Sequence, residues 1–389
     1  MRFDVVVVGG GPVGLAFARS LRGRGLRIAI VERQPLAALS EPASDGREIA
    51  LTHRSARILE ELGAWQRLRA DDIAPLRAAR VLNGASRFAL AFDPAASGDD
   101  RLGQLVPNNC IRRALFQAVE GQPGLELMTG ASVASVARDR AGVTVQLADG
   151  RAIGARLLVA ADSRMSAVRD QLGIAAEVNR TGRSMMVARM AHERDHHGIA
   201  TEWFGGDQTI AMLPLAGRLS SAVLTLPASE IERIAAFDAA AFGREITRRF
   251  DGRLGAMTLA EGPHVYPLVT TYARHFAAPR AALIGDAAVG MHPVTAHGFN
   301  LGLTGQATLA RLVASAAAHG GDIASSSLLR RYETTHRLAT RPLYTATNLL
   351  VRLYTDERPA ARIVRHATLR AGARLPLVRR TVTGLLMQH

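Results

Sequence analysis

The sequence predicts an α/β fold in which a parallel-sheet domain is interrupted by a second, sheet-based domain and followed by a helical tail. Three observations predict it. The chain opens with a β-branched run, Phe3 to Val8, typical of a buried parallel strand. Period-two alternation of apolar residues recurs through the middle of the chain. A late apolar segment, "AALIGDAA", is again strand-like and is followed by helical patterns. The expected first domain covers 1–75, 98–181 and 274–327, the second covers 76–97 and 182–273, and the tail covers 328–389.

The first strand leads into a glycine-rich turn with the spacing of a dinucleotide-binding unit. Gly9, Gly11 and Gly14 form the pattern G-x-G-x-x-G. Such glycines allow a tight turn, close approach of the backbone to a pyrophosphate, and close packing of helix on strand. The second strand, "LRIAIVERQ", ends at Glu32, with Arg33 beside it. A carboxylate there can accept hydrogen bonds from an adenosine ribose, so the unit is predicted to be Rossmann-like.

The spacing of apolar residues predicts the next helices and strands. Residues 54–62 are amphipathic and closed by a glycine, which predicts a helix. Residues 108–120, "NNCIRRALFQAVE", also have helical spacing. The following segment alternates around an Asp149–Gly150 turn and ends in an apolar strand, Leu157 to Ala161. The first domain is therefore expected to resume at that strand.

The middle block, 182–272, is predicted to be the inserted domain. Its segments "SMMVARM", "QTIAMLPL" and "LSSAVLTL" read as strands, and 229–250 reads as one helical stretch. The strand "AALIGDAA" then returns to the first domain and leads into a long helix, 299–318.

Composition excludes several classes of protein. The 389 residues suffice for two or three domains, and no apolar run approaches the roughly 18 residues of a membrane span. Cys110 is the only cysteine, which excludes an intramolecular disulfide and suits a reducing cytoplasm. Every basic residue is Arg, so the net charge of +14 is attributed to coding bias. No nucleic-acid motif, metal-ligand spacing or G-x-S-x-G elbow is present, and we expect neither nucleic acid nor metal.

The C-terminal region combines basic and apolar residues. From Arg330 onwards there are 12 Arg against three acids, together with the stretches "NLLVRLY" and "LPLVRRTVTGLLM". This combination predicts reversible contact with an anionic membrane surface, at the inner membrane of a cytoplasmic protein. A helix pair that packs in a dimer or on another domain would account for the same pattern.

Two later motifs each place an Asp at the end of an apolar strand. Asp162 follows a strand in "LLVAADSRMSAVR", and Gly285–Asp286 ends one in "AALIGDAAVGMHPVTAHGFNLGL". Ligands of open α/β sheets bind beyond the carboxyl ends of strands. A carboxylate there suits ribose or ribityl hydroxyls, and the helix start after the second motif suits an anionic ring or phosphate.

Together the three motifs resemble those of the flavoprotein aromatic hydroxylases of the p-hydroxybenzoate hydroxylase type, which use them for one FAD. The stretch "SDGREIALTHRSARILEELGAW", Ser44 to Trp65, resembles the ubiquinone-biosynthesis branch, as do the late motif and the helical tail. The resemblance covers nearly the whole chain. This chain departs from the common family pattern at Ser163, Val289 and the Ala296–His297 pair.

The resemblance implies which residues contact the FAD. His297 and Pro293 are the implied catalytic residues, with His297 able to hydrogen-bond the flavin or help to ionise a phenol. Tyr266 and Tyr272 lie near the end of the inserted domain, where they could face the substrate; packing in the core or on the surface is the preferred interpretation of both. The implied cofactor contacts are Gly9, Gly11 and Gly14 at the pyrophosphate, Glu32 at the adenosine ribose with Arg33 beside it, Arg47 and Arg112 from neighbouring elements, Asp162, Gly285, Asp286 at the ribityl chain, and Pro293, Gly298, Phe299 and Asn300 around the isoalloxazine ring.

The resemblance also implies the reaction: an FAD-dependent monooxygenase that hydroxylates the aromatic ring of a polyprenylated phenol or quinone precursor in ubiquinone biosynthesis. NAD(P)H or a separate reductase would reduce the flavin, and O2 would then give a flavin C4a-hydroperoxide. The implied partners are a lipophilic substrate, O2, a membrane surface or quinone-biosynthesis proteins, and a second copy of the chain. Two alternatives stay open: a soluble aromatic-compound hydroxylase, and a non-catalytic FAD-binding assembly or sensor protein.

Overall fold

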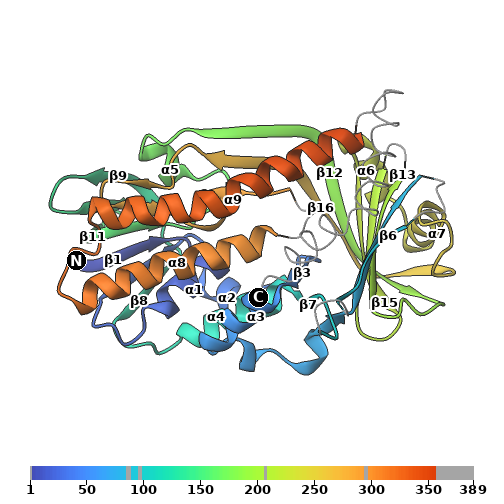
Figure 1. Ribbon diagram of the computed structural model, residues 1–389, viewed down its shortest axis with the longest axis horizontal. Coiled ribbons are helices and arrows are strands. Elements are labelled where there is room, and N and C mark those ends of the chain that lie inside the picture. The colour runs from blue at the N-terminus through green and yellow to red at the C-terminus, as the bar shows by residue number, and fades with distance from the viewer. Residues whose placement is uncertain (1, 85–88, 95–98, 206–207, 293–296, 356–389) are drawn as a thin grey trace.

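The computed structural model describes residues 2–84, 89–94, 99–205, 208–292 and 297–355. Figure 1 shows two sheet-containing bodies side by side, with long helices along one of them. The α/β class predicted from the sequence is confirmed. The division into two domains with the predicted boundaries stays a prediction.

The first sheet is built around the N-terminal strand. Its central order is β17-β18-β11-β1-β2-β8, and β1 is parallel to both of its neighbours. Apolar residues fill both faces, because Val5, Val6 and Val7 are all fully buried. The strands are β1 (Arg2–Val8), β2 (Ile28–Glu32), β8 (Leu125–Thr129), β9 (Val133–Arg138), β10 (Val143–Leu147), β11 (Ala152–Ala160), β17 (Ala277–Ala278) and β18 (Ala281–Leu283).

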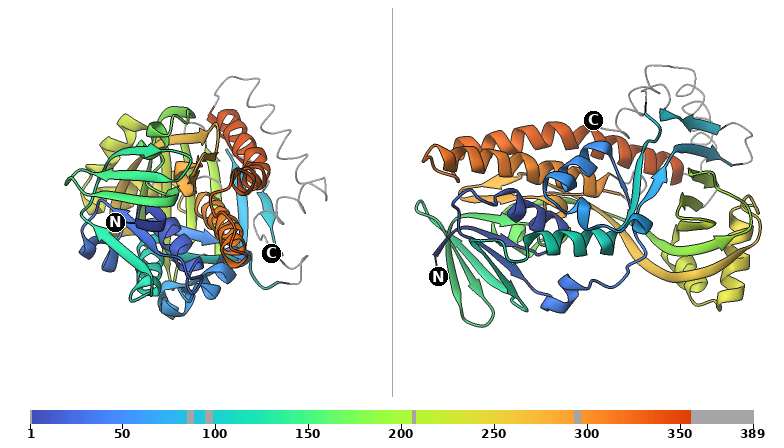
Figure 2. Two further views of the ribbon diagram at one scale, coloured as in Figure 1. Left: turned by 90° about the vertical axis from the view of Figure 1, so that its left-hand side faces the viewer. Right: turned by 90° about the horizontal axis from the view of Figure 1, so that it is seen from below.

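Helices cover this sheet. α1 (Pro12–Ser20) packs between α4 (Asn108–Val119) and α8 (Gly298–Ala318), and α9 (Ser326–Thr355) lies against α8. The views in Figures 1 and 2 agree that α8 and α9 run side by side. Shorter helices complete the layer: α2 (Leu36–Ser40), α3 (His53–Glu61) and α5 (Ala167–Gln171). The helices predicted from periodicity around 54–62, 108–120 and 299–318 are thus confirmed.

The second large sheet has the order β19-β16-β12-β15-β14-β13-β5-β6. Two 17-residue antiparallel strands, β12 (Ala176–His192) and β16 (Met257–Ala273), reach from the first body to the second (Figure 1). The other strands are β5 (Ala78–Asn83), β6 (Ala89–Phe92), β13 (Ile199–Gly205), β14 (Gln208–Pro214), β15 (Leu219–Pro227) and β19 (Val289–Gly290). A small third sheet joins the two bodies and consists of β3 (Glu48–Leu51), β4 (Ala74–Leu76) and β7 (Gly103–Pro107).

One face of the second sheet packs on two helices, α6 (Ala228–Ala235) and α7 (Ala239–Arg249). The single helical stretch predicted for 229–250 is therefore wrong. The break has a local cause: the Asp238 carboxylate accepts a hydrogen bond from the Ala241 backbone N–H at 2.7 Å and caps α7. Covering this face with helices leaves the other face of the sheet free to line a cavity.

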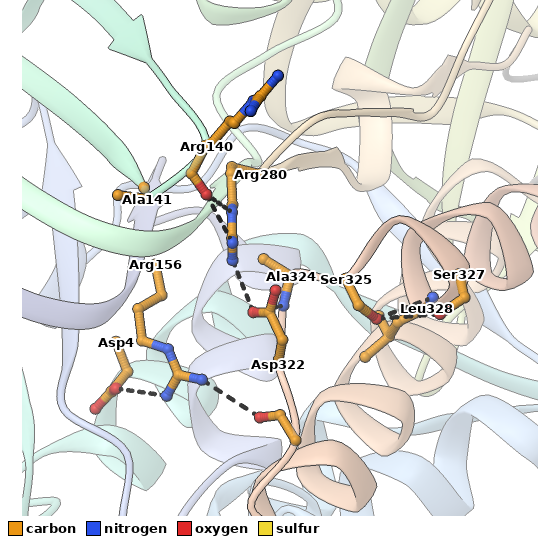
Figure 3. A network of polar contacts seen from close by, with 12 residues as sticks. Asp4, Arg140, Ala141, Arg156, Arg280, Asp322, Ala324, Ser325, Ser327 and Leu328 are labelled. Carbon is orange, nitrogen blue, oxygen red and sulfur yellow. Dashed lines mark hydrogen bonds and ion pairs between the residues drawn. The ribbon is translucent and has the colours of Figure 1, made fainter.

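Arg156 and Arg280 tie the α8–α9 connection to the first sheet (Figure 3). Arg156 pairs with Asp4 at 3.2 Å and also donates to the carbonyl of Gly321 at 3.3 Å. Arg280 pairs with Asp322 at 2.7 Å. These contacts fix the start of α9 relative to β1 and β11.

The helical tail predicted from residue 328 is present as α9, which begins at Ser326. Residues 356–389, which hold most of the basic and apolar pattern noted in the sequence, lie outside the described residues. Of the helices that the structure describes, none combines the length and the apolar character needed to span a bilayer.

Candidate functional site

A cavity of about 750 Å³ runs from the glycine-rich turn of the first sheet to the free face of the second. Its walls come from the ends of β1, β2, β11 and β18, from β3, and from β12 to β16. The lining includes ten of the residues predicted to contact the cofactor: Gly11, Glu32, Arg33, Arg47, Arg112, Asp162, Gly285, Asp286, Gly298 and Phe299. The tertiary structure thus brings all three sequence motifs to one space.

The three glycines of the turn have different surroundings. Gly9 has a φ of +110°, and a Cβ there would overlap the carbonyl oxygen of Ala161. A Cβ on Gly14 would overlap the carbonyl oxygen of Gly9. Gly11, at a φ of −69°, has nothing within 4 Å of a Cβ placed on it. Gly9 and Gly14 therefore serve the fold, whereas Gly11 faces open space on the cavity wall.

Glu32 is held at the cavity by the backbone. Its carboxylate accepts hydrogen bonds from the N–H of Gly10 at 2.6 Å and of Gln34 at 2.7 Å. The first turn of α1 carries no side-chain cap, and Pro12 stands at its start. A helix start without a side-chain cap favours an anion, so the turn offers a phosphate group backbone donors and a favourable dipole.

Arg47 lies on the cavity within a network of polar groups. Its guanidinium donates to the Asp45 carboxylate at 2.6 Å and lies 5.4 Å from the centre of the Tyr266 ring. Asn108 also donates to Asp45, at 2.7 Å. Burial works to raise the pKa of the Asp45 carboxyl, but the hydrogen bond and charge of Arg47 outweigh it and lower the pKa. Arg112 reaches the cavity from α4 and donates to the Ala38 carbonyl at 3.3 Å.

The second and third motifs are joined by an ion pair. Arg164, two residues after Asp162, donates to one oxygen of the Asp286 carboxylate at 3.0 and 3.2 Å and to the Val269 carbonyl at 2.6 Å. Asp162 Oδ2 accepts from the Val168 N–H at 3.4 Å. Asp162 Oδ1 is buried and has no hydrogen-bond partner. This oxygen on the cavity wall therefore has acceptor capacity left for a ligand.

Arg169 holds the loops of these two motifs together from behind. Its side chain is 3% exposed, and its guanidinium donates to the carbonyls of Arg164 at 3.0 Å and Ala287 at 3.3 Å. The Ser166 hydroxyl accepts from the Arg169 backbone N–H at 2.9 Å and caps α5. A buried arginine thus sets the spacing between the two Asp-bearing loops.

Replacing Arg169 by Met is expected to lower the free energy of unfolding by about 2 kcal/mol, because two carbonyls lose a charged donor in the interior. The Asp162 and Asp286 loops would then separate, so FAD retention should fall as well. Chemical denaturation and the flavin-to-protein ratio check both effects. Arg253→Met removes an exposed arginine and serves as the control; equal losses in the two variants would contradict the role of Arg169.

Residues around the start of α8 differ in whether they line the cavity. His292, Gly298 and Phe299 line the cavity. Burial, aided by Arg164 and Arg183, lowers the pKa of His292 to about 4, so this imidazole is neutral at neutral pH.

Two further predicted residues that the structure describes, His297 and Asn300, do not line the cavity. His297 is buried directly before α8. Asn300 is buried, and its amide donates to the Ala50 carbonyl at 2.8 Å and accepts from the Thr52 N–H at 3.1 Å. Pro293 lies outside the described residues.

The two tyrosines behave differently. Tyr272 is in the core as predicted, 1% exposed and 3.1 Å from the Thr340 hydroxyl. Tyr266 instead lines the cavity and donates to the Asp45 carbonyl at 2.6 Å, so for this residue the preferred interpretation, packing in the core or on the surface, is wrong and the alternative position facing the cavity is observed. Its place follows from the pairing of Met185 with Tyr266 in the second sheet, which puts both on the cavity face.

Several cavity residues were not singled out from the sequence. They are Glu48 on β3, Arg183 on β12, and Glu202 on β13. The alternation of the strands at 184–226 shows which residues share a face. It does not show which face the helices cover.

The geometry fits a dinucleotide that carries a flat ring system. Gly11 leaves room for a phosphate, Glu32 and Asp162 offer carboxylate acceptors, and the cavity extends past Asp286 to a largely apolar sheet face. A volume of about 750 Å³ is in the range of cofactor sites.

Comparison with known proteins agrees with this geometry. The model of a family described as "FAD binding domain" matches residues 2–346. The ubiquinone hydroxylase UbiM of Neisseria meningitidis is 43% identical over 384 residues, which are 98% of this chain and 83% of that protein. The ubiquinone hydroxylase UbiL of Rhodospirillum rubrum is 32% identical over 99% of this chain and 89% of its own. Among solved structures, p-nitrophenol 4-monooxygenase PnpA of Pseudomonas putida has a TM-score of 0.78 at 20% identity, covering 98% of this chain and 97% of that one.

Proposed function

Because the chain belongs to the FAD-binding domain family and is an FAD-dependent monooxygenase, we propose that it hydroxylates the aromatic ring of a polyprenylated phenol or quinone precursor in ubiquinone biosynthesis. The observation that carries the proposal is the single cavity that joins the dinucleotide-binding turn to an apolar sheet face. Bound FAD supplies the activation of O2 for insertion into the ring. The protein supplies binding, orientation and exclusion of water.

The proposed FAD contacts follow the cavity lining. Gly11 and the first turn of α1 would hold the pyrophosphate, and Glu32 would hold the adenosine ribose. Asp162, with a free acceptor oxygen, and Asp286 would bind hydroxyl groups of the cofactor. Gly9 and Gly14 would act through the turn they allow. Arg33, Arg47, Arg112, Gly285, Gly298 and Phe299 would complete the site.

The flavin ring would lie near the start of α8. We propose that Pro293 and His297 border its reactive edge, together with Phe299, which lines the cavity. Asn300 would act indirectly, because its amide ties the start of α8 to β3 through Ala50 and Thr52.

The substrate would occupy the other half of the cavity. That wall is formed by Met185, Val187, Ala211, Leu213 and Val223. Apolar residues in this number suit an aromatic ring that carries a prenyl chain. A neutral His292 at the junction adds a polar group without a charge.

A polyprenylated substrate is delivered from lipid. The basic and apolar residues after Arg330 would then serve a cytoplasmic protein by reversible contact with the inner membrane surface, or by contact with partner proteins or a second copy. Binding of the full chain to anionic vesicles, compared with neutral ones, tests the membrane contact.

The function is tested by loading the full chain with FAD and supplying NADPH or NADH, O2 and a phenol with a short prenyl chain. The expected result is substrate-dependent NAD(P)H oxidation and a hydroxylated product found by mass spectrometry. Turnover only of small water-soluble phenols would favour a soluble aromatic-compound hydroxylase. Flavin that is reduced by dithionite but never yields product would favour an assembly or sensor protein.

A further inference from the structure

Glu202 is the acidic residue on the wall that the substrate would meet. It lies in the middle of β13, opposite Ala211 of β14 and Val81 of β5, and lines the cavity. Its chain neighbours Thr201 and Trp203 point to the opposite face, where Trp203 packs with the α6–α7 core. Because successive side chains of a strand point to opposite faces, the Glu202 carboxyl points into the cavity.

The surroundings of this carboxyl are mostly apolar. The register places Val187, Val223, Ala211 and Glu202 in one row across β12, β15, β14 and β13. The neighbouring row on the same face consists of Met185, Thr225, Thr209 and Phe204. A charged carboxylate in such a wall destabilises the folded state unless a hydrogen-bond or ion-pair partner compensates for its lost hydration.

Glu202 has no such partner within the described part of the chain, where it forms no hydrogen bond or ion pair. The other carboxylates on the β3 side of the cavity differ, because Arg189 pairs with Glu48 at 2.8 Å and with Glu261 at 2.9 Å. Burial raises the pKa of Glu202 to about 8. Facing a largely apolar wall without a counter-charge among the described residues, the carboxyl favours its protonated form, which can donate a hydrogen bond.

Among the residues that the structure describes, no charged group pairs with Glu202. Arg80 on β5 donates to the Thr201 hydroxyl at 2.9 Å, on the other face of the sheet. β14 has no titratable residue in its sequence, and the described titratable residues of the adjoining cavity wall are Arg183, Tyr266 and His292. Burial raises the pKa of Tyr266, so its phenol is neutral at neutral pH. Arg183 donates to the Thr225 carbonyl at 3.4 Å, and His292 is neutral at neutral pH.

We propose that Glu202 is a substrate-positioning residue, whose carboxyl group donates a hydrogen bond to an oxygen substituent of the aromatic ring and so orients the ring toward the flavin. The proposal rests on the proposed function. It adds a specific hydrogen-bond donor to a largely apolar wall: the prenyl chain and ring bury apolar surface, whereas the carboxyl selects a ring that carries oxygen.

The test uses the FAD-loaded full chain with a ubiquinone analogue that has one prenyl unit, because its ring oxygens can only accept hydrogen bonds. Equilibrium dialysis measures its Kd for the wild type and for Glu202→Gln, Glu202→Leu and Glu126→Gln. Glu126 is an exposed strand residue on β8 and is the matched control. We expect Glu202→Leu to raise the Kd about tenfold, whereas Glu202→Gln, which keeps a donor, and Glu126→Gln stay within about threefold of the wild type.

The pH dependence separates a donor from a general packing role. Affinity of the wild type should be constant well below pH 8 and fall as the pH rises through about 8, since deprotonation removes the donor and leaves a charge facing ring oxygens. Glu202→Gln should show no such loss between pH 7 and 9. In turnover with the prenylphenol, Glu202→Leu should raise KM and release more hydrogen peroxide per NAD(P)H oxidised, because a misoriented ring captures oxygen less often.

The outcomes distinguish failure of the Glu202 proposal from failure of the proposed function. If the wild type binds the analogue and forms product, and Glu202→Leu has the same Kd and KM as the wild type, only the role of Glu202 is overturned. Absence of both in an FAD-loaded wild type would overturn the proposed function, and the inference with it. Glu202→Gln controls for folding, because it keeps the volume of the side chain; a loss in Glu202→Gln equal to that in Glu202→Leu would also contradict a donor.

Discussion

Replacing Gly11 by Val is expected to leave the apoprotein folded while weakening FAD binding at least about a hundredfold, which corresponds to about 2.7 kcal/mol. The backbone of Gly11 has a φ of −69° and a ψ of 175°, which a β-branched residue adopts without strain. Nothing in the protein lies within 4 Å of its added Cβ. The new side chain therefore starts in open space on the cavity wall and is expected to clash with the ligand, at the point where the pyrophosphate would approach the turn.

Two further variants make this result specific. In Gly14→Val the new Cβ overlaps the Gly9 carbonyl, so the melting temperature of the apoprotein should fall together with FAD binding. Gly205→Ala adds a Cβ with only ordinary contacts at 3.6 Å and beyond, and should change neither. Titration with FAD and thermal unfolding of the apoproteins supply both readouts. Normal FAD affinity in Gly11→Val would show that the pyrophosphate lies elsewhere.

Replacing Arg189 by Met is expected to lower the free energy of unfolding by about 3 kcal/mol at neutral pH. The Glu48 side chain is fully buried, its Oε1 accepts from Arg189 at 2.8 and 3.1 Å, and its Oε2 has no partner. Glu261 is bound by the same guanidinium and by the Ser44 hydroxyl. Loss of Arg189 would leave a buried carboxylate without its counter-charge.

The pH dependence of this loss has a defined sign. Burial, opposed by Arg189, raises the pKa of Glu48 in the folded protein above its unfolded value. The folded state then binds more protons than the unfolded state, so the stability contributed by Glu48 falls as pH rises above about 4.5. Without Arg189 the pKa of Glu48 rises further. The loss in free energy of unfolding of Arg189→Met, relative to the wild type, should therefore be small near pH 5 and grow towards neutral pH.

A surface pair is the matched control for Arg189. Arg248 pairs with Glu245 at 2.8 Å, but its side chain is 67% exposed. Solvent screens such pairs, so Arg248→Met should cost less than about 0.5 kcal/mol. Urea denaturation of both variants at pH 5 and pH 7 gives the comparison. A cost for Arg189→Met as small as that of Arg248→Met would show that Glu48 finds another partner or is neutral in the wild type.

The elements that were predicted most closely are those whose cause is local. The run Phe3 to Val8 is buried on both faces and became the central strand β1. The glycine spacing that predicted a tight turn corresponds to a real constraint, since Gly9 has a positive φ. The missed break at Asp238 was also local: an Asp followed by a helix-forming run is an N-cap signal, and it was present in the sequence.

The site was predicted as separate motifs rather than as an assembly. Each Asp-bearing motif could be located at a strand end, but the pairing of Arg164 with Asp286 joins residues 122 positions apart. Glu202 gave no sequence signal of its own, and Tyr266 could not be distinguished from Tyr272, because alternation assigns residues to a face without saying what lies on it. The exposure of Glu202 and Tyr266 to the cavity depends on α6 and α7 covering the opposite face.

The sequence by itself thus determined the dinucleotide-binding unit, the α/β class and the family, because glycine spacing, strand periodicity and the three motifs are properties of short segments. Tertiary structure alone decided which charges face the cavity, which are paired, and how the two sheets enclose one space. The physical reason is that ion pairing, burial and the pKa changes they cause depend on neighbours brought together by folding. Arg169, Arg189 and Glu202 are each an ordinary residue in the sequence, and their energetic roles arise only from what surrounds them.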